Sequence, residues 1–181
     1  MLLSRARDRV SVPWKNGRGS TVDVAIGPPG ASLTDFDWRV SLAGIRGDVP
    51  FSLFPGMDRI LTVVEGPGMT LTATSGEMLQ AHADRPISFP GETAFVCQLH
   101  QGPVTAFNVM TRRGSPAGSV EIVSLPTTVV HRGAVTLVVA LRDSMTAAEY
   151  SLAAWDAVQL APEDGDVELT GVGVAAIVRI G

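Results

Sequence analysis

Apolar and polar residues alternate along several short segments of the chain, as expected of strands that bury one face. Residues 69–73 alternate throughout, and residues 36–43 follow the same two-residue period. Turns rich in glycine and proline, such as Gly66-Pro67-Gly68, separate these segments. The pattern predicts one helical turn between Ser144 and Tyr150, and it predicts strands at 22–26, 36–45, 59–65, 69–73, 86–89, 93–99, 103–110, 119–124, 134–141, 156–160, 166–170 and 173–180.

Many short strands joined by such turns are typical of an all-β sandwich or barrel. A faint internal repeat fits this class, because 60–64, 86–92 and 104–110 resemble 135–139, 157–163 and 172–178. The offset is roughly 70 residues, which suggests two similar β units. The alternative is that any two antiparallel segments look alike at this level. Only the first copy carries a cluster of polar residues, so we expect any chemistry to lie there and the second copy to be mainly structural.

Composition excludes several classes of partner. The formal net charge is −4, and the basic residues are scattered, so nothing favours nucleic acid as a partner. The single cysteine, Cys97, cannot form an internal disulfide and lies in an apolar segment, where core packing is expected. No apolar stretch is long enough for a signal peptide or a membrane span, so we expect a cytoplasmic protein with no membrane partner.

The chain contains one lysine, Lys15, followed by one of its two asparagines, Asn16. The other asparagine is Asn108. Arginine supplies every other positive side chain, so a lone ammonium beside a scarce amide indicates a place where these groups matter chemically. A solvated loop lysine is the alternative interpretation.

Residues 36–43 would present two different faces as a strand. Phe36, Trp38, Val40 and Leu42 share one face, whereas Asp37, Arg39, Ser41 and Ala43 share the other. In a barrel with an open mouth, the second face would line a cavity. The surrounding segments add cationic and neutral donors: Lys15, Arg39, Arg59, Arg112, Asn16, Asn108, Ser41 and Thr21. This inventory suits a small carboxylate. Alternatively, Asp58–Arg59 and Asp37–Arg39 are local ion pairs.

Other chemistries have little support in the sequence. His82, His100 and His131 lie far apart, without metal-binding spacing, so no metal or other cofactor is expected. There is no Gly-x-Ser-x-Gly nucleophile motif and no phosphate-binding loop that contains lysine.

Motifs across residues 13–114 resemble the HutD/Ves family of small bacterial proteins. They are Trp14-Lys15-Asn16-Gly17-x-Gly19-x-Thr21, Phe36-Asp37-Trp38-Arg39-x-Ser41-x-Ala43, Pro50-Phe51-Ser52-x-Phe54-Pro55-Gly56-x-Asp58-Arg59, Gly66-x-Gly68-Met69-x-Leu71 and Phe107-Asn108-Val109-Met110-Thr111-Arg112-Arg113-Gly114. The chain departs from the family pattern at Arg18, Val22-Asp23, Val49 and Ala106.

The resemblance implies a cupin-like (RmlC-type) fold, a double β-barrel or jelly roll with two pseudo-repeated halves. Residues 1–181 would form a single bicupin-like domain, with an N-terminal barrel at about 1–115 and a C-terminal barrel at about 116–181. It also implies a role in regulating histidine utilisation, through a small carboxylate metabolite such as formylglutamate or urocanate.

We therefore predict a metal-independent binding protein for a carboxylate metabolite. Lys15, Arg59 and Arg112 would hold the carboxylate, Asn16 and Asn108 would contact an amide or ring nitrogen, and aromatic side chains would form an apolar wall. The predicted ligand-binding residues are Trp14, Lys15, Asn16, Gly17, Thr21, Trp38, Arg39, Ser41, Phe51, Phe54, Asp58, Arg59, Asn108, Met110 and Arg112.

Two alternatives remain open. One is a metal-independent enzyme acting on a histidine-degradation intermediate, with Lys15 as general acid/base, which we favour less than a binding protein. The other is a scaffold that binds another protein through its Trp and Phe loops. Edge strands would also be compatible with a homodimer.

Overall fold

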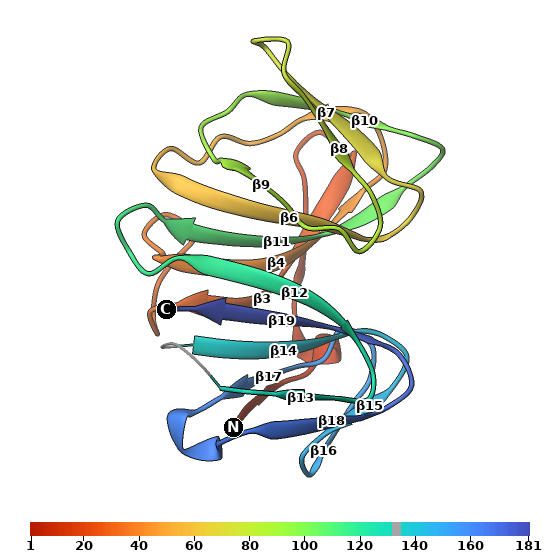
Figure 1. Ribbon diagram of the computed structural model, residues 1–181. Helices are drawn as coiled ribbons and strands as arrows, with labels where there is room; N and C mark the ends of the chain where they lie inside the picture. Colours follow the sequence, from red (N-terminus) through yellow and green to blue (C-terminus); the bar gives the residue numbers. More distant parts are fainter. Residues whose placement is uncertain (132–134) are drawn as a thin grey trace. The chain divides into compact units, whose positions relative to one another are not determined.

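The computed structural model describes residues 1–131 and 135–181, and strands make up most of this part of the chain (Figure 1). Its two short 3-10 helices are Ala6–Asp8 and Pro162–Asp164. The chain divides into two compact units. We call Val10–Pro116 the first unit, and Met1–Arg9 together with Ala117–Gly181 the second unit. No helix in the described residues is long and apolar enough to cross a membrane.

The first unit contains two antiparallel sheets with an apolar core. The six-stranded sheet has the order β2 (Ser11–Pro13), β3 (Gly19–Gly27), β4 (Trp38–Ile45), β11 (Val104–Arg112), β6 (Met57–Glu65) and β9 (Ile87–Pro90). The four-stranded sheet has the order β5 (Val49–Pro50), β10 (Phe95–Leu99), β7 (Met69–Ala73) and β8 (Met78–Ala81). Leu61, Leu71 and Phe95 are among the fully buried side chains of the core, to which both sheets contribute.

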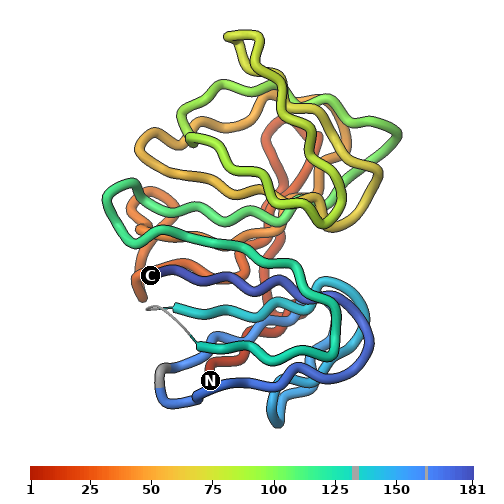
Figure 2. The backbone as a smooth tube through the Cα atoms, viewed as in Figure 1, coloured from red at the N-terminus to blue at the C-terminus, as the bar shows by residue number. Residues whose placement is uncertain are grey.

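The second unit has a five-stranded sheet and a four-stranded sheet. The first has the order β1 (Leu2–Ser4), β17 (Ala157–Leu160), β14 (Val135–Arg142), β19 (Val174–Ile180) and β12 (Gly118–Ser124). The second has the order β13 (Thr127–Val129), β18 (Val167–Gly171), β15 (Met145–Ala147) and β16 (Tyr150–Leu152). Figure 2 shows the N-terminal residues, in red, beside strands of this unit, because β1 pairs with β17.

The all-β class is confirmed. In the described residues the sheets are not closed, so each unit is an open pair of sheets, as in the jelly-roll form of the prediction. Residues 1–9 belong to the second unit and not, as expected, to the N-terminal half.

The predicted helical turn at Ser144–Tyr150 is wrong, because this segment forms the β15–β16 hairpin. The predicted strands correspond to observed strands, except that residue 134 lies outside the described residues. The short strands β1, β2, β5, β8, β13, β15 and β16 were not predicted.

The repeat inferred from sequence appears in the strand order. The order β4-β11-β6-β9 corresponds to β12-β19-β14-β17, and β5-β10-β7-β8 corresponds to β13-β18-β15-β16. The strand pairs β6–β11 and β14–β19 correspond in this order, and each contains one register shift. The shift falls between Thr105 and Ala106 of β11 in the first unit, and between Ala140 and Arg142 of β14 in the second. Matching these shifts aligns Val63 with Ala140, and Asn108 with Ile177. The sequence comparison had aligned Asn108 with Ala176, which lies on the opposite face of its strand.

Candidate functional site

Alternation along β4 directs one row of side chains into the interior of the first unit. Arg39, Ser41, Ala43 and Ile45 lie on this face, as predicted for the polar face of 36–43. Strand pairing extends the row sideways: Ser41 is opposite Asn108 of β11, and Met110 of β11 is opposite both Arg39 and Arg59 of β6. The register of three neighbouring strands therefore brings distant polar residues together.

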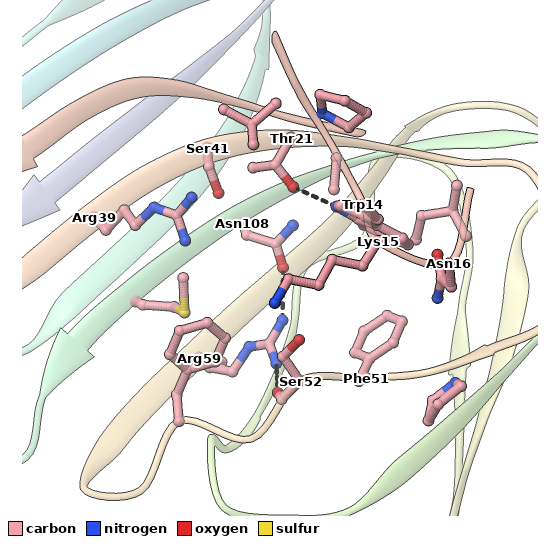
Figure 3. Close-up of a pocket in the computed structure, with 17 residues that line it drawn as sticks. Trp14, Lys15, Asn16, Thr21, Arg39, Ser41, Phe51, Ser52, Arg59 and Asn108 are labelled. Atoms are coloured by element: carbon pink, nitrogen blue, oxygen red, sulfur yellow. Dashed lines mark hydrogen bonds between the residues drawn. The ribbon is translucent and has the colours of Figure 1, made fainter. Parts of the chain in front are cut away.

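These residues line a cavity of about 520 Å³ within the first unit (Figure 3). The six-stranded sheet supplies one wall, the loop after β2 supplies the second, and residues 50–54 supply the third. The volume is in the range of small-molecule sites. The lining residues are Val12, Pro13, Trp14, Lys15, Asn16, Thr21, Arg39, Ser41, Ala43, Ile45, Pro50, Phe51, Ser52, Phe54, Arg59, Asn108 and Met110.

Arg59 is the central charged group of this cavity, and it is only 7% exposed. Its Nη1 donates to the carbonyl oxygen of Ser52 and its Nη2 donates to Oδ1 of Asn108, both at 3.2 Å. The guanidinium carbon also lies 5.1 to 5.4 Å from three phenyl ring centres, those of Phe51, Phe54 and Phe89. Among the described residues, the Nε of Arg59 has no hydrogen-bond partner.

No carboxylate pairs with Arg59 in residues 1–131 and 135–181. Burial, assisted by the charge of Arg39, lowers the pKa of Arg59 to about 10, so it remains a cation at neutral pH. Burying a charge without a counter-ion costs several kcal/mol. The carbonyl oxygen of Ser52, the amide oxygen of Asn108 and the phenyl ring faces offset only part of this cost. The cavity thus contains a cation that lacks an anionic partner.

Arg39 differs from Arg59 because it is neutralised within the sheet. Its Nε and Nη2 donate to Oδ1 of Asp23 at 2.7 and 2.6 Å. Asp23 lies on β3, opposite Ser41 of the neighbouring strand. The alternative interpretation of a local pair between Asp37 and Arg39 is therefore wrong.

Trp14 and Lys15 come from the tight loop between β2 and β3. The indole Nε1 of Trp14 donates to Oγ1 of Thr21 at 2.8 Å, and the Trp14 backbone N–H donates to the Gly19 carbonyl at 2.9 Å. A β-carbon at Gly19 would lie 2.7 Å from the Trp14 ring, so this position requires glycine for the ring to pack. The loop therefore fixes the direction in which Lys15 leaves the backbone.

Lys15 extends across the cavity with its amino group directed towards Arg59 and Asn108 (Figure 3). In the described part of the chain, its ammonium makes no hydrogen bond or ion pair. Asn16 also lines the cavity, but its Oδ1 accepts a hydrogen bond from the Arg18 backbone N–H at 3.0 Å. That bond stabilises the loop and occupies part of the amide that we expected to contact a ligand.

Four predicted site residues do not line this cavity: Gly17, Trp38, Asp58 and Arg112. Trp38 lies on the opposite face of β4 from Arg39, and its indole packs against Gly27. Gly17 has a φ of +70° and shapes the turn of the loop. The other two form surface ion pairs, Arg112 with Asp37 at 2.9 Å and Asp58 with Arg113 at 2.8 Å. Asp58 therefore does not pair with Arg59, and Arg112 is not positioned to hold a ligand there.

The sequence did not identify six of the lining residues: Val12, Pro13, Ala43, Ile45, Pro50 and Ser52. Alternation along β4 provided a signal for Ala43 and Ile45. Ser52 contributes a backbone carbonyl, which no side-chain pattern indicates.

Cys97 is fully buried, as predicted, and burial raises the pKa of its thiol to about 12, which makes a nucleophilic role unfavourable.

The three histidines do not come together. His82 and His100 follow the ends of β8 and β10, with ring centres 6.3 Å apart, and His131 belongs to the second unit. No group of three or more His, Cys, Asp or Glu in residues 1–131 and 135–181 is arranged to hold a metal ion.

A sequence model of HutD matches residues 6–177, nearly the whole chain. The chain belongs to the HutD family. Protein Ves of Citrobacter koseri is 34% identical over 128 residues, which cover 70% of this chain and 66% of that protein, slightly less than two-thirds of its length. A Pseudomonas putida protein, described as an uncharacterized 21.2 kDa protein in the hutC 3′ region, is 36% identical over 60% of this chain and 56% of its own length.

Solved structures extend the likeness to the whole fold. HutD from Pseudomonas fluorescens SBW25, in a formate condition, superimposes with a TM-score of 0.85 at 29% identity, covering 99% of this chain and 98% of that protein. A cupin 2 conserved barrel domain protein from Leptotrichia buccalis, with 7% identity and a TM-score of 0.59, shares the fold alone and covers 94% of this chain and 92% of that protein. The cupin-like fold class is thus confirmed for this HutD chain.

Proposed function

We propose that this HutD protein binds a small carboxylate metabolite in the cavity of its first unit. The observation that carries the proposal is the buried guanidinium of Arg59, which faces the cavity without a carboxylate partner. A ligand carboxylate would supply the missing counter-ion and take up donors that remain on Nη1 and Nη2.

The surrounding groups favour a ligand with an acid at one end and a less polar body. Lys15 adds a second positive charge at the cavity, and Asp23 neutralises only Arg39. Phe51, Phe54 and the Trp14 ring provide apolar surface beside these cations. A charge-assisted hydrogen bond contributes about 1.5 to 3 kcal/mol, so a few of them support micromolar to millimolar affinity after immobilisation costs.

The family assignment supports a place in histidine utilisation, since a related protein is encoded beside hutC. Formylglutamate and urocanate, the ligands suggested by the family resemblance, are both small carboxylates and are the first candidates to test. A regulatory role would follow if binding reports the level of such an intermediate.

Titration calorimetry with formylglutamate, urocanate and formate tests the proposal. We expect the wild-type protein to bind at least one acid with micromolar to millimolar affinity, and Arg59→Met to weaken this binding by about a hundredfold, because two charge-assisted bonds are lost. Arg112→Met is the matched control, because it removes an arginine that pairs with Asp37 outside the cavity, and binding should be unchanged. Absence of binding, or equal losses in the two variants, would contradict the proposal.

One observation favours testing the enzyme alternative as well. Lys15, the only lysine of the chain, extends into the cavity, and its ammonium has no hydrogen-bond or ion-pair partner in the described residues. Following the same titrations by NMR would detect any turnover. Turnover that Lys15→Met abolishes, while the variant still binds the acid, would favour catalysis over simple binding.

A further inference from the structure

Asn108 is the side chain that holds Arg59 in place. It is 5% exposed, and its position on β11 is fixed by pairing with Ser41 on one side and Leu61 on the other. Because Arg59 can only donate, the oxygen of the Asn108 amide must face Nη2, and Nδ2 then lies 3.4 Å from the Ala106 carbonyl oxygen. The amide orientation therefore follows from the chemistry of its neighbours.

A carboxylate at this position would accept the same hydrogen bond from Arg59 but would lose the bond to the Ala106 carbonyl oxygen, and it would change the charge of the site. Aspartate has nearly the same shape as asparagine, and its oxygen would accept the same bond from Nη2 of Arg59. It would also neutralise a cation that has no other counter-ion in the described residues. The neutral amide therefore positions Arg59 without cancelling its charge.

Resting on the proposed function, we propose that Asn108 is the residue that determines the charge preference of the cavity. By accepting a hydrogen bond from Arg59 without supplying a negative charge, it reserves the guanidinium for an anionic group of the ligand. Asn108 thus acts through Arg59 as a positioning residue, and Nη2 of Arg59 takes one of the two lone pairs of its amide oxygen.

The two asparagines of the chain allow a matched test, because both line the cavity and both convert to aspartate with the same change in net charge. We expect Asn108→Asp to weaken binding of the best acid found for the wild type at least tenfold more than Asn16→Asp does. Only Asn108→Asp places the new carboxylate on Arg59, whereas Asn16 contacts the Arg18 backbone N–H in an exposed loop.

The melting temperature supplies a second readout, which a merely structural role for Asn108 would not produce. We expect Asn108→Asp to melt several degrees higher than the wild type at pH 7, because the counter-ion gained by the buried cation outweighs the long hydrogen bond lost at the Ala106 carbonyl. The gain should disappear as acidification protonates the new carboxyl group, and Asn16→Asp should show no such gain.

Equal losses of affinity in the two variants would overturn the inference, because a general charge effect would then explain both. A lower melting temperature, or failure of Asn108→Asp to fold, would overturn it as well, since an acid at this position is expected to stabilise the fold. If the wild type binds none of the acids, the proposed function fails, and the inference fails with it. Binding that survives Asn108→Asp would overturn the inference alone.

Discussion

Asn108 in the first unit and Ile177 in the second occupy the same position in two sheets that have the same strand order. Counted from the matching register shifts, the paired residues of β6 and β11 are Val63–Ala106, Leu61–Asn108 and Arg59–Met110. The corresponding pairs of β14 and β19 are Ala140–Ala175, Val138–Ile177 and Thr136–Arg179. The pairs next to the register shift are therefore apolar in both units, whereas two residues further along the strand the first unit has Asn108 and the second has Ile177.

This difference shows which of the two units can bury a polar side chain at this position of the sheet. Ile177 is 2% exposed and packs within the apolar core of the second unit. Asn108 is equally enclosed but has Arg59 as a partner, and the cavity in front of both leaves room for a ligand. A buried amide is tolerated in the first unit because a neighbouring strand supplies its donor.

A second difference concerns the turn that follows β8 in the first unit and β16 in the second. Asp84 and Trp155 both have positive φ, and their backbone N–H groups donate to the matching carbonyl oxygens of Val63 and Ala140. The next residue is Arg85 in the first unit and Asp156 in the second. The carboxylate of Asp156 binds the N-terminal segment, so in the second unit this turn also anchors residues 5 and 6.

Ile177→Asn would introduce into the second unit the amide that the first unit accepts, and it should have the largest effect on stability. The amide would be buried among apolar side chains and would replace well-packed hydrocarbon, so we expect the free energy of unfolding to fall by about 3 to 5 kcal/mol. Urea denaturation measures this change. Ile177→Leu, which alters shape but not polarity, should cost less than about 1.5 kcal/mol. Similar losses in the two variants would mean that polarity is not what separates the units.

Asp156→Ala should have the next largest effect and should not change ligand binding in the first unit. Asp156 is 4% exposed, and its carboxylate accepts hydrogen bonds from the Ala6 N–H at 2.7 Å, Arg5 Nη1 at 2.8 Å and the Ala153 N–H at 3.1 Å. Its loss should lower the free energy of unfolding by about 2 to 3 kcal/mol at pH 7. Asp8→Ala, which breaks an exposed pair with Arg7, is the control and should change it by less than about 0.5 kcal/mol.

The effect of Asp156→Ala should also depend on pH. Burial opposes ionisation of Asp156, but its hydrogen bonds and the Arg5 charge outweigh burial and lower the pKa below its usual value. A carboxyl group whose pKa is lowered by folding stabilises the protein above its unfolded pKa, and this contribution is lost as the pH falls through the folded pKa. The difference between wild type and variant should therefore shrink below about pH 4. A constant difference from pH 7 to pH 3 would contradict this account.

Long alternating or β-branched segments made most of the fold predictable, and alternation along 36–45 correctly placed Arg39 and Ser41 on the face that lines the cavity. Alternation also contained information that the site prediction did not use. Adjacent residues of a strand point to opposite faces, so Asp58 could not share a face with Arg59, nor Trp38 with Arg39. These errors were avoidable from the sequence.

Other features depend on tertiary structure. Arg112 follows Asn108 and Met110 at even spacing, but it lies at the end of β11, where its Nε donates a hydrogen bond to Oδ1 of Asp37 at 2.9 Å. The strand β5 contains only two residues, Val49 and Pro50, too few for a periodic signal. The segment 144–150 has alanine and glutamate, which favour a helix, and its hairpin turn has no glycine or asparagine to indicate it.

That turn provides the smallest test of the comparison. The loop between β15 and β16 consists of Ala148 and Glu149, and Ala148 has a φ of +49°, at the position where such turns prefer glycine. The corresponding hairpin of the first unit uses Gly76, with a φ of +92°. We expect Ala148→Gly to raise the free energy of unfolding by about 0.5 kcal/mol, because relief of the strained conformation slightly exceeds the added entropy of the unfolded chain. Gly76→Ala should lower it by about 1 kcal/mol. Urea denaturation of both variants checks the pair, and a loss of stability in Ala148→Gly would show that the alanine side chain contributes more than its backbone strain costs.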